Sequence, residues 1–195
     1  MALYKLRIAL AKLRSHYRLF RFRFSALLHR GTMVIGEHTT FSHPVRFQGR
    51  GRLIIGDYVN LGYGLAGSSA MPILLQPRDL GAEIYIGKGS TITNGCELFA
   101  RTAIRIGERC MVGPQTLILD SDFHSVAPNE RHLAGKTAAV IIGDNVWVGT
   151  RVIILKGITV HRDAVIASGS VVAKDVDAGA IVGGNPARVI GSVYA

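Results

Sequence analysis

The fold is decided by residues 141–176, which read IIGDNVWVGTRVIILKGITVHRDAVIASGSVVAKDV. Aliphatic residues return there at every sixth position, and a small or apolar residue stands two places before each of them. A period of six matches neither the 3.6-residue period of an α-helix nor the alternation of a plain hairpin. It predicts a parallel β-solenoid in which each aliphatic side chain stacks on its equivalent one coil away. The sixfold series consists of Ile142, Val148, Ile154, Val160, Ile166, Val172 and Ala178.

The same period extends toward the N-terminus, so one solenoid accounts for most of the chain. Glycine follows the aliphatic residue in pairs such as Ile55-Gly56 and Ile86-Gly87, where it relieves the steric limits of a corner. Three faces of six residues would complete one coil. We therefore expect an all-β solenoid domain over residues 32–195, a separate segment over residues 1–31, and a loop protruding at about 119–140.

The pattern of an aliphatic residue, a glycine and four further residues resembles the hexapeptide repeat of left-handed β-helix acyltransferases. The resemblance covers roughly residues 32–190, and the closing string Gly183-Gly184-Asn185-Pro186-Ala187-Arg188-Val189-Ile190 resembles the end of the sugar O-acetyltransferase branch. It implies a left-handed parallel β-helix and a homotrimer with active sites between neighbouring prisms. It also implies an acyl-CoA donor, usually acetyl-CoA, and a saccharide acceptor.

Composition narrows the functional classes. The chain has 195 residues with 48% hydrophobic residues and a net charge of +10, but no acidic residue precedes Glu37. The rest of the chain is near neutral, which argues against a nucleic-acid-binding body. No stretch reads as a membrane span or a signal peptide, and two cysteines make no disulfide scaffold, so we expect a cytoplasmic protein. Cys96 and Cys110 stand two places before inward aliphatic residues and are predicted to pack in the core.

The basic N-terminal segment carries an apolar stripe with steps of three and four residues, which predicts an amphipathic helix to about residue 16. Strict alternation from Phe20 to Phe24 predicts a strand beyond it. The stripe either packs on the end of the solenoid or lies on an anionic membrane, at its inner face, through residues 2–30. Its members are Leu3, Leu6, Leu10, Leu13, Tyr17, Phe20, Phe24 and Leu27.

The repeat stops after Ile118 and resumes at Ile142, and a loop of that length inside a compact fold is usually functional or disordered. Asp120, Asp122 and His124 lie close together at its start. An imidazole can act as a general base at neutral pH, and a nearby carboxylate can fix its tautomer. The resemblance places the catalytic histidine at His124, while either acid remains open as its orienting partner.

The other expected site residues come mainly from the resemblance. Asn94 corresponds nearly to an asparagine that contacts the acceptor or the acyl carbonyl, although Thr93-Asn94-Gly95 also reads as a corner turn. The backbone N–H groups of Gly149 or Thr150 are expected to form an oxyanion hole, and Lys174 and Arg188 to meet the coenzyme phosphates. The whole predicted donor cleft comprises Trp147, Gly149, Thr150, Ser168, Ala173, Lys174 and Arg188.

The sequence therefore predicts an acyl-CoA-dependent transferase, most simply an acetyltransferase, that acylates a hydroxyl or amino group of a saccharide with His124 as general base. A different class also fits the repeat: a non-catalytic trimeric scaffold or a membrane-associated assembly module. His38 and His43 have the spacing of a zinc pair, but no third histidine is well placed, so no metal site is predicted.

Overall fold

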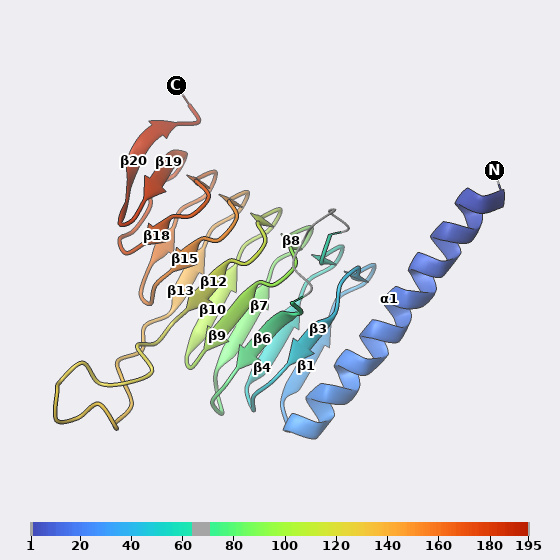
Figure 1. Cartoon of the computed structure of the whole chain (residues 1–195), viewed down its shortest axis with the longest axis horizontal. Coiled ribbons are helices and arrows are strands. Elements are labelled where there is room, and N and C mark those ends of the chain that lie inside the picture. The colour runs from blue at the N-terminus through green and yellow to red at the C-terminus, as the bar shows by residue number, and fades with distance from the viewer. Residues whose placement is uncertain (1, 64–70, 195) are drawn as a thin grey trace.

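The computed structural model describes residues 2–63 and 71–194, without the side chains of residues 2–5, 7, 8 and 26. A long N-terminal helix, α1 (Ala2–His29), lies across one end of a three-sided prism built from short strands (Figure 1). The predicted parallel solenoid is confirmed over the described residues.

The strands stack into three sheets, one for each face of the prism. Neighbouring strands run parallel, and β20 turns back antiparallel on β19. The first sheet contains β1 (Thr32–Ile35), β4 (Arg52–Ile55), β7 (Glu83–Ile86), β10 (Ala103–Ile106), β13 (Val140–Ile142) and β16 (Thr159–Val160). The second contains β2 (Thr40–Phe41), β5 (Asn60–Leu61), β8 (Thr91–Ile92), β11 (Met111–Val112), β14 (Trp147–Val148), β17 (Val165–Ile166), β19 (Ala180–Gly184) and β20 (Ala187–Ser192). The third contains β3 (Val45–Phe47), β6 (Ile73–Pro77), β9 (Glu97–Ala100), β12 (Leu117–Leu119), β15 (Ile153–Ile154) and β18 (Val171–Val172).

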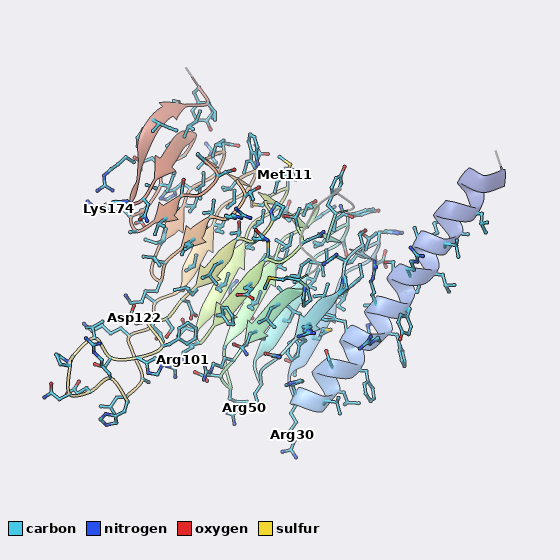
Figure 2. All side chains as sticks on the ribbon, in the orientation of Figure 1. Arg30, Arg50, Arg101, Met111, Asp122 and Lys174 are labelled. Carbon is cyan, nitrogen blue, oxygen red and sulfur yellow. The ribbon has the colours of Figure 1, made fainter. Side chains whose placement is uncertain are left out.

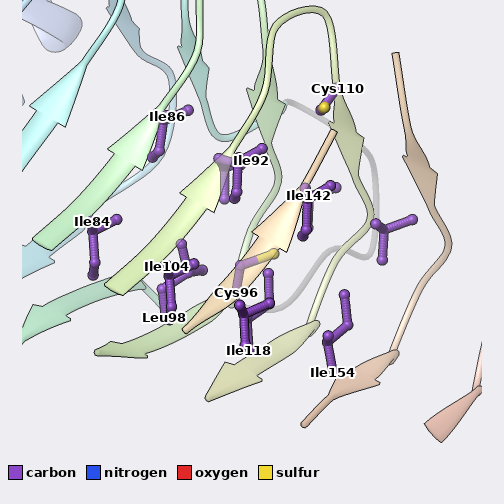
Figure 3. Close-up of a cluster of buried hydrophobic side chains, with 14 of the residues drawn as sticks. Ile84, Ile86, Ile92, Cys96, Leu98, Ile104, Cys110, Ile118, Ile142 and Ile154 are labelled. Atoms are coloured by element: carbon purple, nitrogen blue, oxygen red, sulfur yellow. The ribbon is translucent and has the colours of Figure 1, made fainter. Parts of the chain in front are cut away.

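The aliphatic residues of the repeat fill the interior of the prism. Ile142 pairs with Val160 on the next coil, and Ile154 pairs with Val172, so equivalent side chains stack in columns. Figure 3 shows part of this core, where side chains from all three faces converge. These residues are almost completely buried, and their burial is the main favourable contribution to folding.

Both cysteines belong to this core. The thiol of Cys96 donates a hydrogen bond to the carbonyl oxygen of Gly113 at 3.1 Å, and that of Cys110 to the carbonyl oxygen of Gly143 at 3.0 Å. Burial raises the pKa of Cys96 to about 11 and also raises the pKa of Cys110. Both thiols therefore stay protonated at neutral pH, as residues that pack rather than attack.

Helix α1 is longer than the sequence predicted, because it continues through the Phe20–Phe24 alternation to His29. The expected strand is therefore wrong. The alternation arises because the phenylalanines point to two sides of one helix. Phe22 is 1% exposed and packs against Phe41 and Phe47, with ring centroids 5.3 and 6.3 Å away.

The apolar stripe of α1 faces away from the prism. Its described members are between 43 and 73% exposed, whereas the face that contacts the first coil carries Phe22 and the polar residues Ser15 and Arg18. The backbone N–H of Phe41 donates to the Ser15 hydroxyl, and the Arg18 guanidinium donates to the carbonyl oxygen of Phe41. The interpretation in which the stripe packs on the solenoid is therefore wrong. The exposed stripe consists of Leu6, Leu10, Leu13, Tyr17, Phe20, Phe24 and Leu27.

Two edges of the prism matter for the site. The corners between the third and first sheets form one column, which we call the loop edge: residues 78–79, 101–102, 120–138, 156–157 and 173–175. The corners between the second and third sheets form another column, which we call the Asn94 edge: residues 94–95, 114–115, 150–151 and 168–169.

Candidate active site

The interruption of the repeat forms a hairpin-like excursion from the loop edge, seen as the projecting yellow segment in Figure 1. Its two arms are joined by backbone hydrogen bonds from Asp122 N–H to the Lys136 carbonyl and from Ser125 N–H to the Leu133 carbonyl, each 3.0 Å long. His124 lies between these two rungs and bridges to Ala134 across the hairpin. The excursion is thus an ordered platform for the predicted base.

The ring of His124 is held by the backbone of its own loop. Its Nδ1 atom lies 2.9 Å from the carbonyl oxygen of Arg131. A carbonyl oxygen can only accept, so Nδ1 carries a proton in this contact, and in the neutral ring the lone pair is then on Nε2. The side chain is exposed, so Nε2 is available to a substrate. This is the tautomer that a general base requires.

A cavity of about 390 Å³ opens beside His124. Arg101 donates through Nε to Asp79 Oδ2 at 2.7 Å, and the guanidinium carbon of Arg78 lies 5.7 Å from the centre of the Phe123 ring. The volume is within the range of small-molecule sites. Its walls are formed by Arg78, Asp79, Arg101, Phe123, His124, His132, Leu133 and Ala134.

Within the described residues, neither Asp120 nor Asp122 forms a hydrogen bond with the His124 ring. Asp120 is fully buried and accepts hydrogen bonds from the backbone N–H groups of Arg101 and Thr102, at 2.8 and 2.7 Å. Its carboxylate therefore fixes a corner of the preceding coil.

Asp122 instead forms an ion pair with Lys156, with 2.9 Å between Oδ1 and Nζ. The pair ties the hairpin to the following coil on the loop edge. Sequence reasoning missed Lys156, because nothing in the hexads distinguishes it from a solvated corner residue. The His124 ring is oriented instead by the backbone carbonyl of Arg131, which no pattern of side chains in the sequence could have revealed.

Asn94 lies on the other edge and has a clear structural role. It is 2% exposed, accepts a hydrogen bond from Tyr63 N–H at 2.9 Å and donates one to the Tyr63 carbonyl at 3.0 Å. The residue with positive φ in this turn is Gly95. Within one chain Asn94 and His124 therefore stand at different corners of the prism.

Trp147 points outward from the second sheet, as predicted, and is 53% exposed. It lies between Met111 and Val165 in the strand register, and Met111 is also exposed. An indole open on one face, with an apolar neighbour beside it, can accept a flat ring or an alkyl chain. The environment thus fits part of a coenzyme.

The oxyanion-hole prediction needs correction. The N–H of Gly149 donates to the carbonyl of Ile166 at 2.8 Å, and the N–H of Thr150 donates to Ser168 Oγ at 3.1 Å. Both donors are used between coils, because the coils approach closely at this corner. The N–H of Thr150 can donate to a ligand only if the Ser168 hydroxyl moves away. The N–H of Gly149 remains in the hydrogen-bond ladder between coils.

The remaining predicted donor residues lie in two different parts of the prism. Ala173 and Lys174 follow β18 on the loop edge, whereas Arg188 is exposed on β20. Figure 2 shows Arg101, Asp122 and Lys174 following one side of the prism, with Met111 away from them. One prism therefore brings His124, Ala173 and Lys174 to one edge, and Asn94, Thr150 and Ser168 to another.

Among residues 2–63 and 71–194, no group of three histidine, cysteine or acidic side chains is arranged to hold a metal ion. His38 stacks on Tyr58, and His43 Nε2 lies 2.9 Å from the Met71 carbonyl. No helix in the described part of the chain is long and apolar enough to cross a membrane.

Comparison with known proteins agrees with the repeat fold. Residues 139–174 match the family described as bacterial transferase hexapeptide (six repeats). The galactoside O-acetyltransferase of Lactococcus lactis is 33% identical over 110 residues, which is 56% of this chain and 53% of that protein. The chain spans about half the length of such curated relatives.

Solved structures extend the likeness to nearly the whole chain. The polysialic acid O-acetyltransferase OatWY is 27% identical with a TM-score of 0.62, covering 82% of this chain and 74% of that one. A hexapeptide-repeat-containing acetyltransferase of Vibrio cholerae, complexed with acetyl coenzyme A, has a TM-score of 0.61 at 23% identity. It covers 90% of this chain and 77% of that one, and shows the fold.

Proposed function

This chain is a hexapeptide-repeat protein whose relatives are acetyltransferases, sugar O-acetyltransferases among them, and from that premise we propose that it acetylates a saccharide. The acceptor group is a hydroxyl or an amine, and the donor is acetyl-CoA. The observation that carries the proposal is the state of His124, exposed on an ordered loop with Nδ1 held at a carbonyl and Nε2 left to accept a proton.

The reaction follows from that arrangement. Nε2 of His124 accepts the proton of the acceptor hydroxyl as its oxygen attacks the thioester carbon. The tetrahedral intermediate collapses by breaking the carbon–sulfur bond. The protonated ring then returns its proton to the departing thiolate, so coenzyme A leaves as a free thiol and the base is regenerated. No covalent acyl-enzyme is required, in agreement with two buried, protonated cysteines.

The division of the site between two edges supports a shared active site in a trimer. Three left-handed prisms placed side by side would set the loop edge of one copy, with His124 and Lys174, against the Asn94 edge of the next, with Thr150 and Ser168. Trp147 would flank the donor, and Ala173, Lys174 and Arg188 would line its path. Gly149 shapes that corner through its backbone rather than by donating to the thioester.

The exposed stripe of α1 supports a location at the membrane surface. The seven large apolar side chains of the stripe face solvent on a helix that carries arginines and no acidic residue. A basic amphipathic helix of this kind lies in the interface of an anionic bilayer. We propose that the protein binds the cytoplasmic face of the membrane through α1, with the prism on the side of α1 away from the bilayer.

A thiol-release assay with acetyl-CoA against a panel of free and nucleotide-linked sugars tests the activity. Acceptor-dependent release that requires His124 is expected. A trimer that releases no thiol with any acceptor would instead favour the scaffold function. Sedimentation at micromolar concentration tests the assembly separately, because a mass of one chain would contradict both the trimer and the shared site.

A further inference from the structure

The cavity beside His124 carries a positive charge. Among its lining residues, Arg78 and Arg101 are cationic and Asp79 is the one acid. Asp79 forms an ion pair with Arg101, with 2.7 Å between Oδ2 and Nε. In contrast, no acidic side chain of the described residues lies within ion-pair distance of Arg78. Even with both histidines neutral, the cavity therefore keeps one uncompensated guanidinium.

The position of Arg78 is built by the loop that carries the base. Its guanidinium lies over the ring of Phe123, the residue directly before His124. Phe123 packs edge to face on Phe99 with 6.0 Å between ring centroids, and its backbone takes a φ of 61°. A left-handed conformation is uncommon for a phenylalanine and is typical of functional sites. The aromatic side chain of Phe123 thereby contacts both Phe99 and the guanidinium of Arg78.

The charge lies on the coils that precede His124, away from the predicted donor residues. Arg78 and Arg101 belong to the coils before the excursion, whereas Thr150, Ser168 and Lys174 belong to the coils after it. An anion bound by Arg78 would thus sit on the side of the base opposite to the predicted donor residues. Arginine offers a planar pair of donors that matches a carboxylate or a phosphate.

We propose that the acceptor is an anionic saccharide, whose carboxylate or phosphate is bound by Arg78 while a neighbouring hydroxyl meets Nε2 of His124. This inference rests on the proposed acetyl transfer and adds the class of acceptor. Arg101, braced by Asp79, contributes a second positive charge to the same wall. Arg78 is then a residue that determines specificity, and the base remains His124.

Binding of matched sugars to the full-length protein tests the inference without turnover. The two pairs are glucuronate with glucose, and galactose 6-phosphate with galactose, followed by saturation-transfer NMR at low salt. The charged member of at least one pair should bind about tenfold or more tightly, since a charge-assisted hydrogen bond is lost in the neutral sugar. The pair that shows the preference identifies carboxylate or phosphate as the anion. Equal binding within both pairs would overturn the inference, even if acetyl transfer is observed.

Substitution of Arg78 gives the second test. Arg78→Gln should lower kcat/KM for the charged acceptor about tenfold or more, change that for its neutral partner less than twofold, and leave the KM for acetyl-CoA unaltered. Arg78→Lys should restore part of the loss. Arg109→Gln, at an exposed corner on another edge, is the matched control and should change nothing. A raised KM for acetyl-CoA with an unchanged acceptor preference would assign Arg78 to the donor and contradict the proposal. If no sugar is acetylated but the charge preference in binding persists, the proposed reaction fails while the anion site stands.

Discussion

The Nδ1 atom of His124 lies 2.9 Å from the carbonyl oxygen of Arg131, so the returning arm of the excursion holds the ring presented by the outgoing arm. The contact uses backbone, and therefore fixes the tautomer whatever side chain occupies position 131. A catalytic histidine is more often described with a carboxylate behind it. Here the acids of the same loop are engaged elsewhere, one with backbone and one with a lysine.

Replacing His124 with alanine should lower kcat by about 10²–10⁴, the usual loss when a general base is removed. The side chain is exposed, so no core cavity forms and thermal stability should be nearly unchanged. Steady-state kinetics with acetyl-CoA, together with coenzyme A binding, are the measurements. His161→Ala, at an exposed corner, is the control. A variant with activity within about tenfold of the wild type would mean that another group takes the proton.

The ion pair between Asp122 and Lys156 should position the excursion rather than drive the chemistry. Asp122→Asn and Lys156→Met are each expected to lower kcat less than His124→Ala does. The kcat of the double variant should be no lower than that of the less active single variant. The pair is about 30% exposed on both sides, so the effect on unfolding should stay below about 1 kcal/mol. A double-mutant cycle measures both quantities. Arg105→Met, which breaks the pair with Glu83 on the first sheet, should leave kcat unchanged.

The two faces of α1 should separate stability from membrane binding. Phe22→Ala should destabilise the protein by about 3–5 kcal/mol, as is typical for a buried phenylalanine. Phe24 is 54% exposed, so the triple change Leu13→Ser, Phe20→Ser and Phe24→Ser should leave the unfolding temperature nearly unaltered. It should abolish flotation with phosphatidylglycerol vesicles. If the intact chain fails to float with such vesicles at low salt, the membrane location is wrong.

The buried thiol of Cys96 predicts a loss of stability at high pH. The folded thiol keeps its proton to a pKa of about 11, whereas the ordinary pKa of a cysteine thiol is 9.0. The folded state therefore binds more protons than the unfolded state between these values, and the free energy of unfolding falls as pH rises through them. The contribution is fully present below pH 9 and amounts to about 3 kcal/mol at most. Denaturation of the reduced protein at pH 8–11, compared with Cys96→Ala, measures the difference. An identical pH dependence in the two proteins would contradict the burial.

The fold was predictable because the sixfold period is a property of the sequence itself. Ile142, Ile154 and Ile166 could be assigned to the interior without coordinates, and the interruption marked the excursion that carries His124. The path of α1 was not predictable in the same way. The pattern showed an apolar stripe, but which face meets the first coil depends on Phe22 fitting between Phe41 and Phe47.

The details of the site depend on contacts that leave no local signal. Asp122 and Lys156 are distant in sequence, and the Arg131 carbonyl carries no side-chain identity. The expected oxyanion donor at Gly149 failed for a related reason, since its N–H completes a ladder with Ile166 that only the stacked coils reveal. The chemistry of each residue type could be predicted from the sequence, but which groups are free to contact a substrate depends on hydrogen bonds between stacked coils.

Helix α1 also covers one end of the solenoid. A parallel solenoid finishes in exposed strand edges, which are templates for end-to-end stacking of copies into fibres. Here α1 contacts β1, β2 and β3, the first strand of each sheet, and it does so through a polar and aromatic face. At the other end β20 folds back on β19. A chain lacking the helix would present three bare edges at once, so the segment that carries the exposed stripe also limits polymerisation.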